Sequence, residues 1–61
     1  MMNKMSRGLT EAAREAAKAT SPGHETFFAY RRAWYSVTAY PDGKTFLVRR
    51  EDRTMCGKVV L

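Results

Sequence analysis

The alternation of apolar and polar positions divides the chain into one helical segment followed by strands. Residues 10–20, TEAAREAAKAT, are rich in alanine, which has the highest helix propensity of all residues, and carry charges between the alanines. The positions that fall on one side of this helix are Leu9, Ala12 or Ala13, and Ala16. Because these side chains offer little area, we expect the helix to lie close against a sheet.

Both ends of this helix are marked in the sequence. Thr10 is a suitable N-cap, and Glu11 suits the positive end of the helix dipole. The sequence Ser-Pro-Gly at residues 21–23 ends the helix, because proline cannot continue it and glycine commonly follows one. Residues 1–8 show no apolar period, and we interpret them as a flexible basic arm. Residues 9–61 then form a single α+β domain.

The clearest local signal is a hairpin, in which WYSVTAY and KTFLVRR flank the turn sequence Pro-Asp-Gly. Pro41 suits the second position of a type I turn, and Gly43 suits a left-handed bulge residue. We therefore predict a three-residue loop, 41–43, with Tyr40 facing Lys44. The predicted pairs are Thr38 with Phe46, Ser36 with Val48 and Trp34 with Arg50 on one face, and Ala39 with Thr45, Val37 with Leu47 and Tyr35 with Arg49 on the other.

Two further segments complete the predicted sheet. In residues 24–32, HETFFAYRR, the apolar spacing fits a helix, whereas the aromatic content favours a strand. We favour the strand and leave the helix open. Residues 54–61 form a strand in which Gly57 is a bulge. The predicted fold is α+β, with an N-terminal helix packed on a small antiparallel β-meander of about three strands.

The length of the chain limits its core. A 61-residue domain buries only about 60% of the surface that its unfolded chain exposes. Disulfides, a metal or self-association usually stabilise domains of this size. Cys56 is the only cysteine and His24 the only histidine, too few ligands for a structural zinc, so we expect no cofactor. Association, either with a second copy of the chain as a homodimer or with a partner, is therefore expected.

Cysteine content and hydropathy bear on location. A secreted domain this small would usually carry several disulfides, and the chain shows no signal peptide, so we expect a cytoplasmic protein. No apolar run approaches the roughly 18 to 20 residues that span a bilayer, so no membrane association is expected. The formal charge of +5 and the pI near 9.9 favour polyanionic partners.

The predicted hairpin register gathers a candidate binding surface. One face, with Ala33, Tyr35, Val37, Ala39 and Leu47, is small and apolar and is assigned to the core. The other face mixes aromatic rings with cations, a combination that suits nucleic acid because rings stack on unpaired bases and arginines contact phosphates. The candidate binding residues are Arg32, Trp34, Tyr40, Lys44, Phe46 and Arg50. They predict a small non-enzymatic nucleic-acid-binding protein.

Three alternatives stay open at this point. Trp, Tyr and Arg are also enriched at protein hot spots, so the chain could be an interaction module that regulates or inhibits a larger complex. Short basic chains with one cysteine resemble accessory proteins of bacteriophages and mobile elements, which act in this way. Trp34 and Phe46 could instead lie in a homodimer interface, or pack with Val48 in the core of the monomer.

The sequence offers no catalytic or metal-binding constellation. His24 lies beside a loop, and Cys56 lies in an apolar run, where a small buried hydrophobe is the better interpretation. A nucleophilic cysteine would need a nearby base and a positive environment. The sequence also lacks a glycine-rich phosphate loop, so we expect no enzymatic activity.

Overall fold

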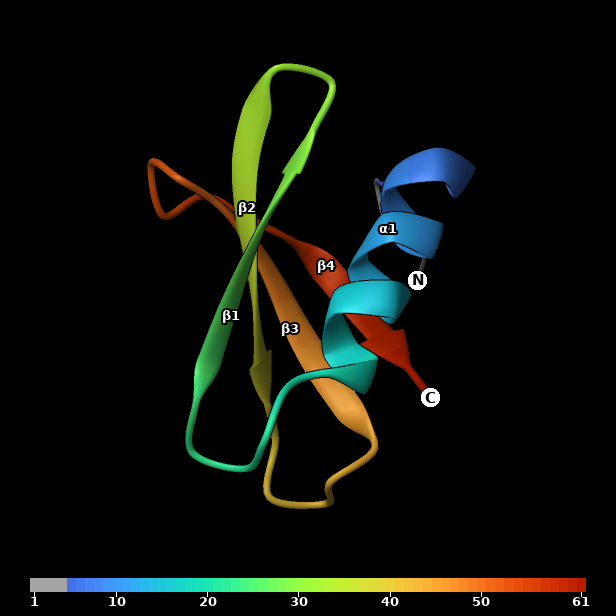
Figure 1. Ribbon diagram of the computed structural model, residues 1–61, viewed down its shortest axis with the longest axis vertical. Helices are drawn as coiled ribbons and strands as arrows, with labels where there is room; N and C mark the ends of the chain where they lie inside the picture. The colour runs from blue at the N-terminus through green and yellow to red at the C-terminus, as the bar shows by residue number, and fades with distance from the viewer. Residues whose placement is uncertain (1–4) are drawn as a thin grey trace.

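The computed structural model describes residues 5–61 and shows one helix on a four-stranded sheet. The elements are α1 (Arg7–Lys18), β1 (Glu25–Tyr30), β2 (Ala33–Ala39), β3 (Thr45–Arg50) and β4 (Met55–Val60). The strands pair antiparallel in the order β1-β2-β3-β4, and α1 lies against one side of the sheet (Figure 1). The predicted α+β class is confirmed, but the sheet has four strands rather than about three because residues 25–30 form a strand of their own.

The helix begins earlier than predicted. Ser6 is the N-cap, and its hydroxyl accepts a hydrogen bond from the Leu9 N–H at 3.1 Å. The predicted cap at Thr10 is wrong: that residue lies inside the helix and its hydroxyl donates to the Ser6 carbonyl at 2.9 Å. The earlier start brings Leu9 into the helix, where it is buried. Of the predicted arm 1–8, residues 1–4 lie outside the described residues, and Arg7 and the residue after it are helical.

The buried side of α1 is made of small side chains at every fourth position. Leu9, Ala13 and Ala17 are buried, whereas the prediction placed Ala16 on this stripe. The separation between helix and sheet is short: a Cβ at Gly8 would collide with the hydroxyl of Tyr30. Ala13 and Ala17 are almost completely buried, so their small side chains allow α1 to lie close to the sheet.

The register of the β2–β3 hairpin differs from the predicted one by one residue. The observed partners are Ala39 with Phe46, Thr38 with Leu47, Val37 with Val48, Ser36 with Arg49 and Tyr35 with Arg50. The Tyr40 N–H donates to the Thr45 carbonyl at 2.8 Å, so the loop holds four residues, 41–44, instead of three. Gly43 does take the predicted left-handed conformation, with φ of 72°.

The carboxylate of Asp42 explains the longer loop. It accepts hydrogen bonds from the N–H groups of Lys44 and Thr45, both at 2.9 Å, and from the Thr45 hydroxyl at 2.7 Å. These bonds need Lys44 inside the turn, whereas the predicted loop placed it in the strand. The three charge-assisted hydrogen bonds of Asp42 outweigh the general preference for a three-residue loop that ends in a glycine bulge.

The change of register exchanges the two faces of β3. Phe46 and Val48 contact the helix, and Leu47 lies on the opposite face instead of in the core beneath α1. The core cluster consists of Ala13, Ala17, Val37, Phe46, Val48 and Val59. The sequence left three placements open for Phe46: the binding surface, a homodimer interface and the core. The core is correct, since this side chain is only 3% exposed.

The β1–β2 hairpin closes through two arginines in an unfavourable backbone conformation. Arg31 and Arg32 lie between the paired residues Tyr30 and Ala33, with φ of 49° and 68°. A two-residue turn with positive φ at both positions normally uses Asn-Gly, because a left-handed conformation costs other residues about 1–2 kcal/mol each. The turn therefore carries two charges at the expense of local stability.

The last strand contains a bulge, but it lies at Cys56, one residue before the predicted position at Gly57. Val48 pairs with Gly57 and Arg49 pairs with Met55, so Cys56 is the additional residue of a bulge. The strand predicted over residues 54–61 is confirmed as β4. No helix within residues 5–61 is long and apolar enough to cross a membrane.

Truncating Phe46 tests the observed register. Phe46→Ala removes a buried ring and is expected to destabilise the fold by about 3 kcal/mol or more. Phe27→Ala removes a ring that is 60% exposed and is expected to change stability by less than about 0.5 kcal/mol. Urea unfolding followed by circular dichroism measures both. A larger loss for the Phe27 variant would contradict the register.

The turn carboxylate predicts a pH dependence. Hydrogen bonds from the Thr45 and Lys44 N–H groups lower the pKa of Asp42 below its ordinary value. The stabilisation is then complete above about pH 4, the unfolded value, and is lost as the pH falls through the lowered folded-state pKa. Asp42→Ala should lower the urea midpoint at pH 7 and should lower it by less at the lowest pH at which the parent remains folded, because protonation of Asp42 weakens the same interaction in the parent. Equal differences at both pH values would contradict this account.

Candidate functional site

One face of the sheet is left uncovered by the described part of the chain. We call it the open face, because α1 packs on the opposite side (Figure 1). The strand registers and the alternation of side chains place these residues on it: Glu25, Phe27, Ala29, Trp34, Ser36, Thr38, Tyr40, Thr45, Leu47, Arg49, Met55, Lys58 and Val60.

Two exposed rings distinguish the open face from an ordinary solvated surface. Phe27 is 60% exposed and Trp34 is 53% exposed. Neither ring makes a stacking or cation–π contact with another residue of the range 5–61. Large apolar side chains are rarely left exposed together, and such a pair indicates a binding surface.

On the open face, the small residue Ser36 lies between Phe27 and Arg49. Ser36 pairs with Phe27 on one side and with Arg49 on the other, so the three residues form a row across β1, β2 and β3. Because neighbouring strands lie about 4.8 Å apart, the outer two residues of this row are separated by roughly 10 Å. Ser36 is buried between its larger neighbours, and Trp34 lies two positions before it in β2. The row therefore places an exposed ring and a guanidinium on either side of a small residue.

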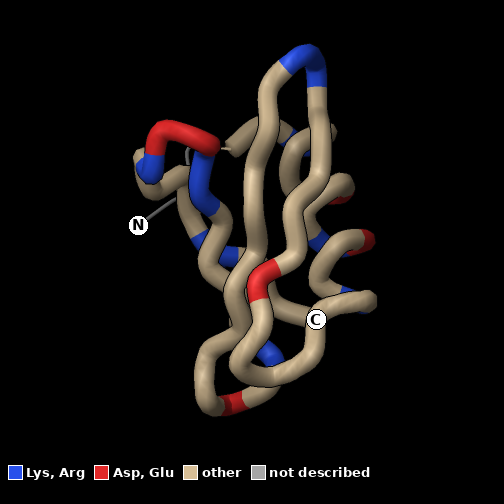
Figure 2. The backbone as a smooth tube through the Cα atoms, turned by 60° about the vertical axis from the view of Figure 1, so that its left-hand side comes forward, with Lys and Arg blue, Asp and Glu red and all other residues tan. Residues whose placement is uncertain are grey.

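Cations surround the open face. Lys58 lies with its ammonium 5.0 Å from the centre of the Tyr40 ring, and both belong to this face. Figure 2, which brings the side away from α1 forward, shows further Lys and Arg positions at the tip of the β1–β2 hairpin and near β3 and β4. Residues 25–61 carry seven cations and four carboxylates, whereas the charges of residues 10–20 balance. Of these two segments, only residues 25–61, which form the sheet and its turns, carry an excess of positive charge.

The structure separates the six predicted binding residues into three groups. Trp34 and Tyr40 lie on the open face, as predicted. Arg32 and Lys44 lie exposed in the two turns that border it. Phe46 and Arg50 are turned to the helix side, because the register is shifted by one. The predicted placement of all six on one face is therefore wrong, and their role in binding stays a prediction.

Three residues of the open face were not foreseen: Phe27, Arg49 and Lys58. A two-residue turn between β1 and β2 would have placed Phe27 on the same side as Trp34. Arg-Arg gives no turn signal of the kind that Asn-Gly gives, so this pairing could not be read from the sequence. Arg49 was placed on the wrong side by the incorrect β2–β3 register.

A second aromatic group lies on the helix side. Phe28 stacks on Tyr35 with ring centres 5.6 Å apart, and Tyr30 meets Tyr35 edge-on at 6.4 Å. The Arg50 guanidinium lies 5.9 Å from the Tyr35 ring centre. These rings are part-buried and contact one another, so they contribute to packing and offer less surface to a ligand than Phe27 and Trp34.

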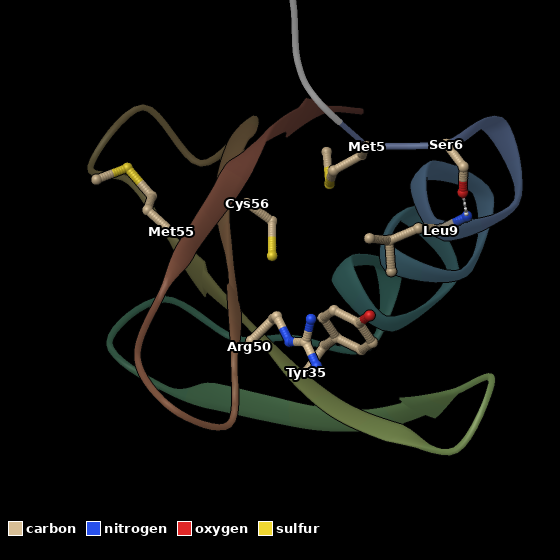
Figure 3. Close-up of a pocket in the computed structure, with 7 residues that line it drawn as sticks. All are labelled: Met5, Ser6, Leu9, Tyr35, Arg50, Met55 and Cys56. Atoms are coloured by element: carbon tan, nitrogen blue, oxygen red, sulfur yellow. Dashed lines mark hydrogen bonds between the residues drawn. The ribbon is translucent and has the colours of Figure 1, made fainter.

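An open pocket of about 220 Å³ lies beside this aromatic group (Figure 3). Its lining residues are Met5, Ser6, Leu9, Tyr35, Arg50, Met55 and Cys56. The Cys56 side chain points inward and that of Met55 points away (Figure 3). Burial raises the pKa of the Cys56 thiol, which lowers the fraction of reactive thiolate at neutral pH.

Pairing of Cys56 with His24 is excluded by the sheet order. His24 directly precedes β1 and Cys56 lies in β4, and these strands form opposite edges of the sheet. Within residues 5–61 no group of three or more His, Cys, Asp or Glu side chains could hold a metal ion.

Comparison with known proteins yields no further guide. No protein-family model matches the sequence, and neither a curated protein nor a solved structure matches it significantly.

Proposed function

We propose that this chain binds single-stranded nucleic acid on the open face of its sheet. The observation that carries the proposal is the pair of exposed rings, Phe27 and Trp34, on an uncovered antiparallel sheet bordered by cations. Stacking of a base on an aromatic side chain contributes about 1–3 kcal/mol, and it does not depend on which base is present. Bases in a duplex are already stacked, so unpaired bases suit these rings best.

The cations near the rings suit the phosphate backbone. Arg49 lies in the row that contains Phe27, and Lys58 lies on the same face in the next strand, β4. Arg31 and Arg32 lie at the tip of the β1–β2 hairpin, close in sequence to Trp34. A strand of nucleic acid stacked on the two rings would meet positive charge on both sides.

The conformation of the hairpin tip supports a functional role for its charges. Arg31 and Arg32 hold left-handed conformations that residues of their size normally avoid. Strained residues concentrate at binding sites, where the surrounding structure maintains them. Because the turn costs stability, a contact of its arginines with an anionic partner would give it a function.

A protein partner is the second candidate, and exposed aliphatic side chains favour it. Val60 and Leu61 are 56% and 44% exposed at the β4 side, and Trp34 is a residue type enriched at hot spots. In this case Trp34→Ala would abolish capture of the partner, and capture would survive nuclease treatment. The chain would then regulate or inhibit the complex that it binds.

Titration of the Trp34 fluorescence tests the stacking. A single-stranded oligonucleotide should quench this only tryptophan saturably and bind more tightly than a duplex of the same length. Phe27→Ala should weaken binding by about tenfold, as expected for the loss of one stacked base. Leu61→Ala truncates another exposed apolar side chain, which follows Val60 and so lies on the helix side of the sheet. It is the matched control and should bind like the parent. Unchanged affinity of the Phe27 variant would exclude this surface.

The hairpin tip gives a test in which stability and binding move in opposite directions. The double variant Arg31→Asn/Arg32→Gly should raise the free energy of unfolding by about 1–2 kcal/mol, because it relieves the left-handed arginines. It should also reduce the slope of log K against log salt by about 1.4, or 0.7 for each lost phosphate contact. The control Arg14→Gln/Lys18→Gln removes two cations from α1 and should leave the slope unchanged. Equal slopes for both variants would contradict a role for the tip.

A further inference from the structure

The outer edge of β1 carries backbone groups without a partner strand. The Tyr40 and Glu51 N–H groups donate to the carbonyls of Thr45 and Trp34, so the even-numbered residues of β2 bond to β3. Antiparallel bonding alternates, so the odd-numbered residues of β2 bond to β1. In the observed register these bonds engage Thr26, Phe28 and Tyr30 of β1. The N–H and C=O groups of Glu25, Phe27 and Ala29 therefore point outward.

The two edges of the sheet are protected to different extents. Opposite Val48 and Arg49, β4 carries a bulge, and Lys58 is one of its outward-bonding residues; both features discourage pairing with another strand. The six residues of β1, ETFFAY, contain no proline, glycine, lysine or bulge. α1 contacts β1 through the helix-side face of the strand, for example at Tyr30, but β1 is the terminal strand of the sheet and no other strand lies along its outer edge (Figure 1). This edge is therefore the one open to a further strand.

We propose that the β1 edges of two copies of this chain pair antiparallel across a two-fold axis, giving a dimer with one continuous eight-stranded sheet. The inference does not depend on the proposed nucleic-acid binding. A second copy fits because the strand is self-complementary in charge: Glu25 lies at its start and Arg31 follows its end. An antiparallel copy brings each of these residues to its opposite charge.

Hydrogen-bond geometry restricts the register of such a dimer. Outward-facing residues must pair with one another, which allows Glu25 to lie opposite Ala29 or opposite Arg31 but not opposite a residue between them. The register with Glu25 opposite Arg31 is favoured because it pairs opposite charges at both ends of the interface. Phe27 of each copy then lies opposite Ala29 of the other on the open face, a large residue beside a small one. On the helix side Phe28 lies opposite its own copy, an aromatic cross-strand pair.

The small core explains why a second copy would stabilise the protein. The largest fully buried side chains are those of Val37 and Val48, which is little for a 61-residue domain. Pairing of the edges satisfies the outward backbone groups and covers part of the exposed Phe27 and Ala29. Both effects favour association.

Sedimentation equilibrium of the full chain, from about 1 μM to about 1 mM, tests the dimer in the range where weak association is measurable. We expect a monomer–dimer equilibrium. Ala29→Pro removes an outward N–H and should give a monomer throughout this range. The matched control is Val60→Pro, which removes an outward N–H on the β4 edge and should remain dimeric. A parent that stays monomeric, or a dimeric Ala29 variant, would overturn the proposal.

A charge exchange tests the register and does not require proline in a strand. Glu25→Arg and Arg31→Glu should each weaken dimerisation by about tenfold or more, because each change places like charges together at both ends of the interface. The double variant Glu25→Arg/Arg31→Glu should restore the parent dissociation constant. Failure of the double variant to dimerise better than either single variant would overturn this register.

Amide hydrogen exchange of the parent chain tests the same edge without any substitution, so effects of a variant on folding do not enter. The outward N–H groups of Phe27 and Ala29 should become protected as the protein concentration rises, whereas those of Thr26 and Phe28 should be protected at every concentration. Concentration-independent exchange at Phe27 and Ala29 would exclude pairing at this edge.

Discussion

The hydrogen bonds of the Asp42 carboxylate determine which side chains lie beneath the helix. They hold Lys44 and Thr45 in a four-residue loop and thereby set the pairing of β2 with β3. With a loop one residue shorter, Phe46 would lie on the open face and the core would lose its only buried ring. An exposed carboxylate in a turn thus controls the interior of a domain whose interior is small.

The same register defines the surface available for binding. Since Phe46 belongs to the core, the open face receives its rings from Phe27 and Trp34, which come from β1 and β2. Their neighbours are cations of β3, β4 and the hairpin tip. The result is an aromatic surface with a positive border, built on rigid strands instead of loops, so its geometry is fixed before any partner binds.

The fold was more predictable than the site, for physical reasons. Alanine propensity and turn residues identified α1 and the β2–β3 hairpin, and the aromatic content of residues 24–32 correctly favoured a strand. The register was not predictable from residue preferences, because three side-chain hydrogen bonds in one turn decided it. Ser6 and Thr10 both belong to residue types that cap helices, and it is Ser6 whose hydroxyl accepts from the Leu9 N–H. Phe27 was missed because its partner strand follows an atypical turn.

The small residues of α1 that face the sheet limit which substitutions the sequence can accept. Ala13 and Ala17 face the sheet with almost no exposed surface, and Gly8 lies against Tyr30. Substitution by any larger residue would push the helix away from the strands, so these positions should drift only among glycine, alanine and serine. The exposed positions between them are free to change. Distant relatives of this protein would therefore share a spacing of small residues along one helix more reliably than they share overall sequence identity.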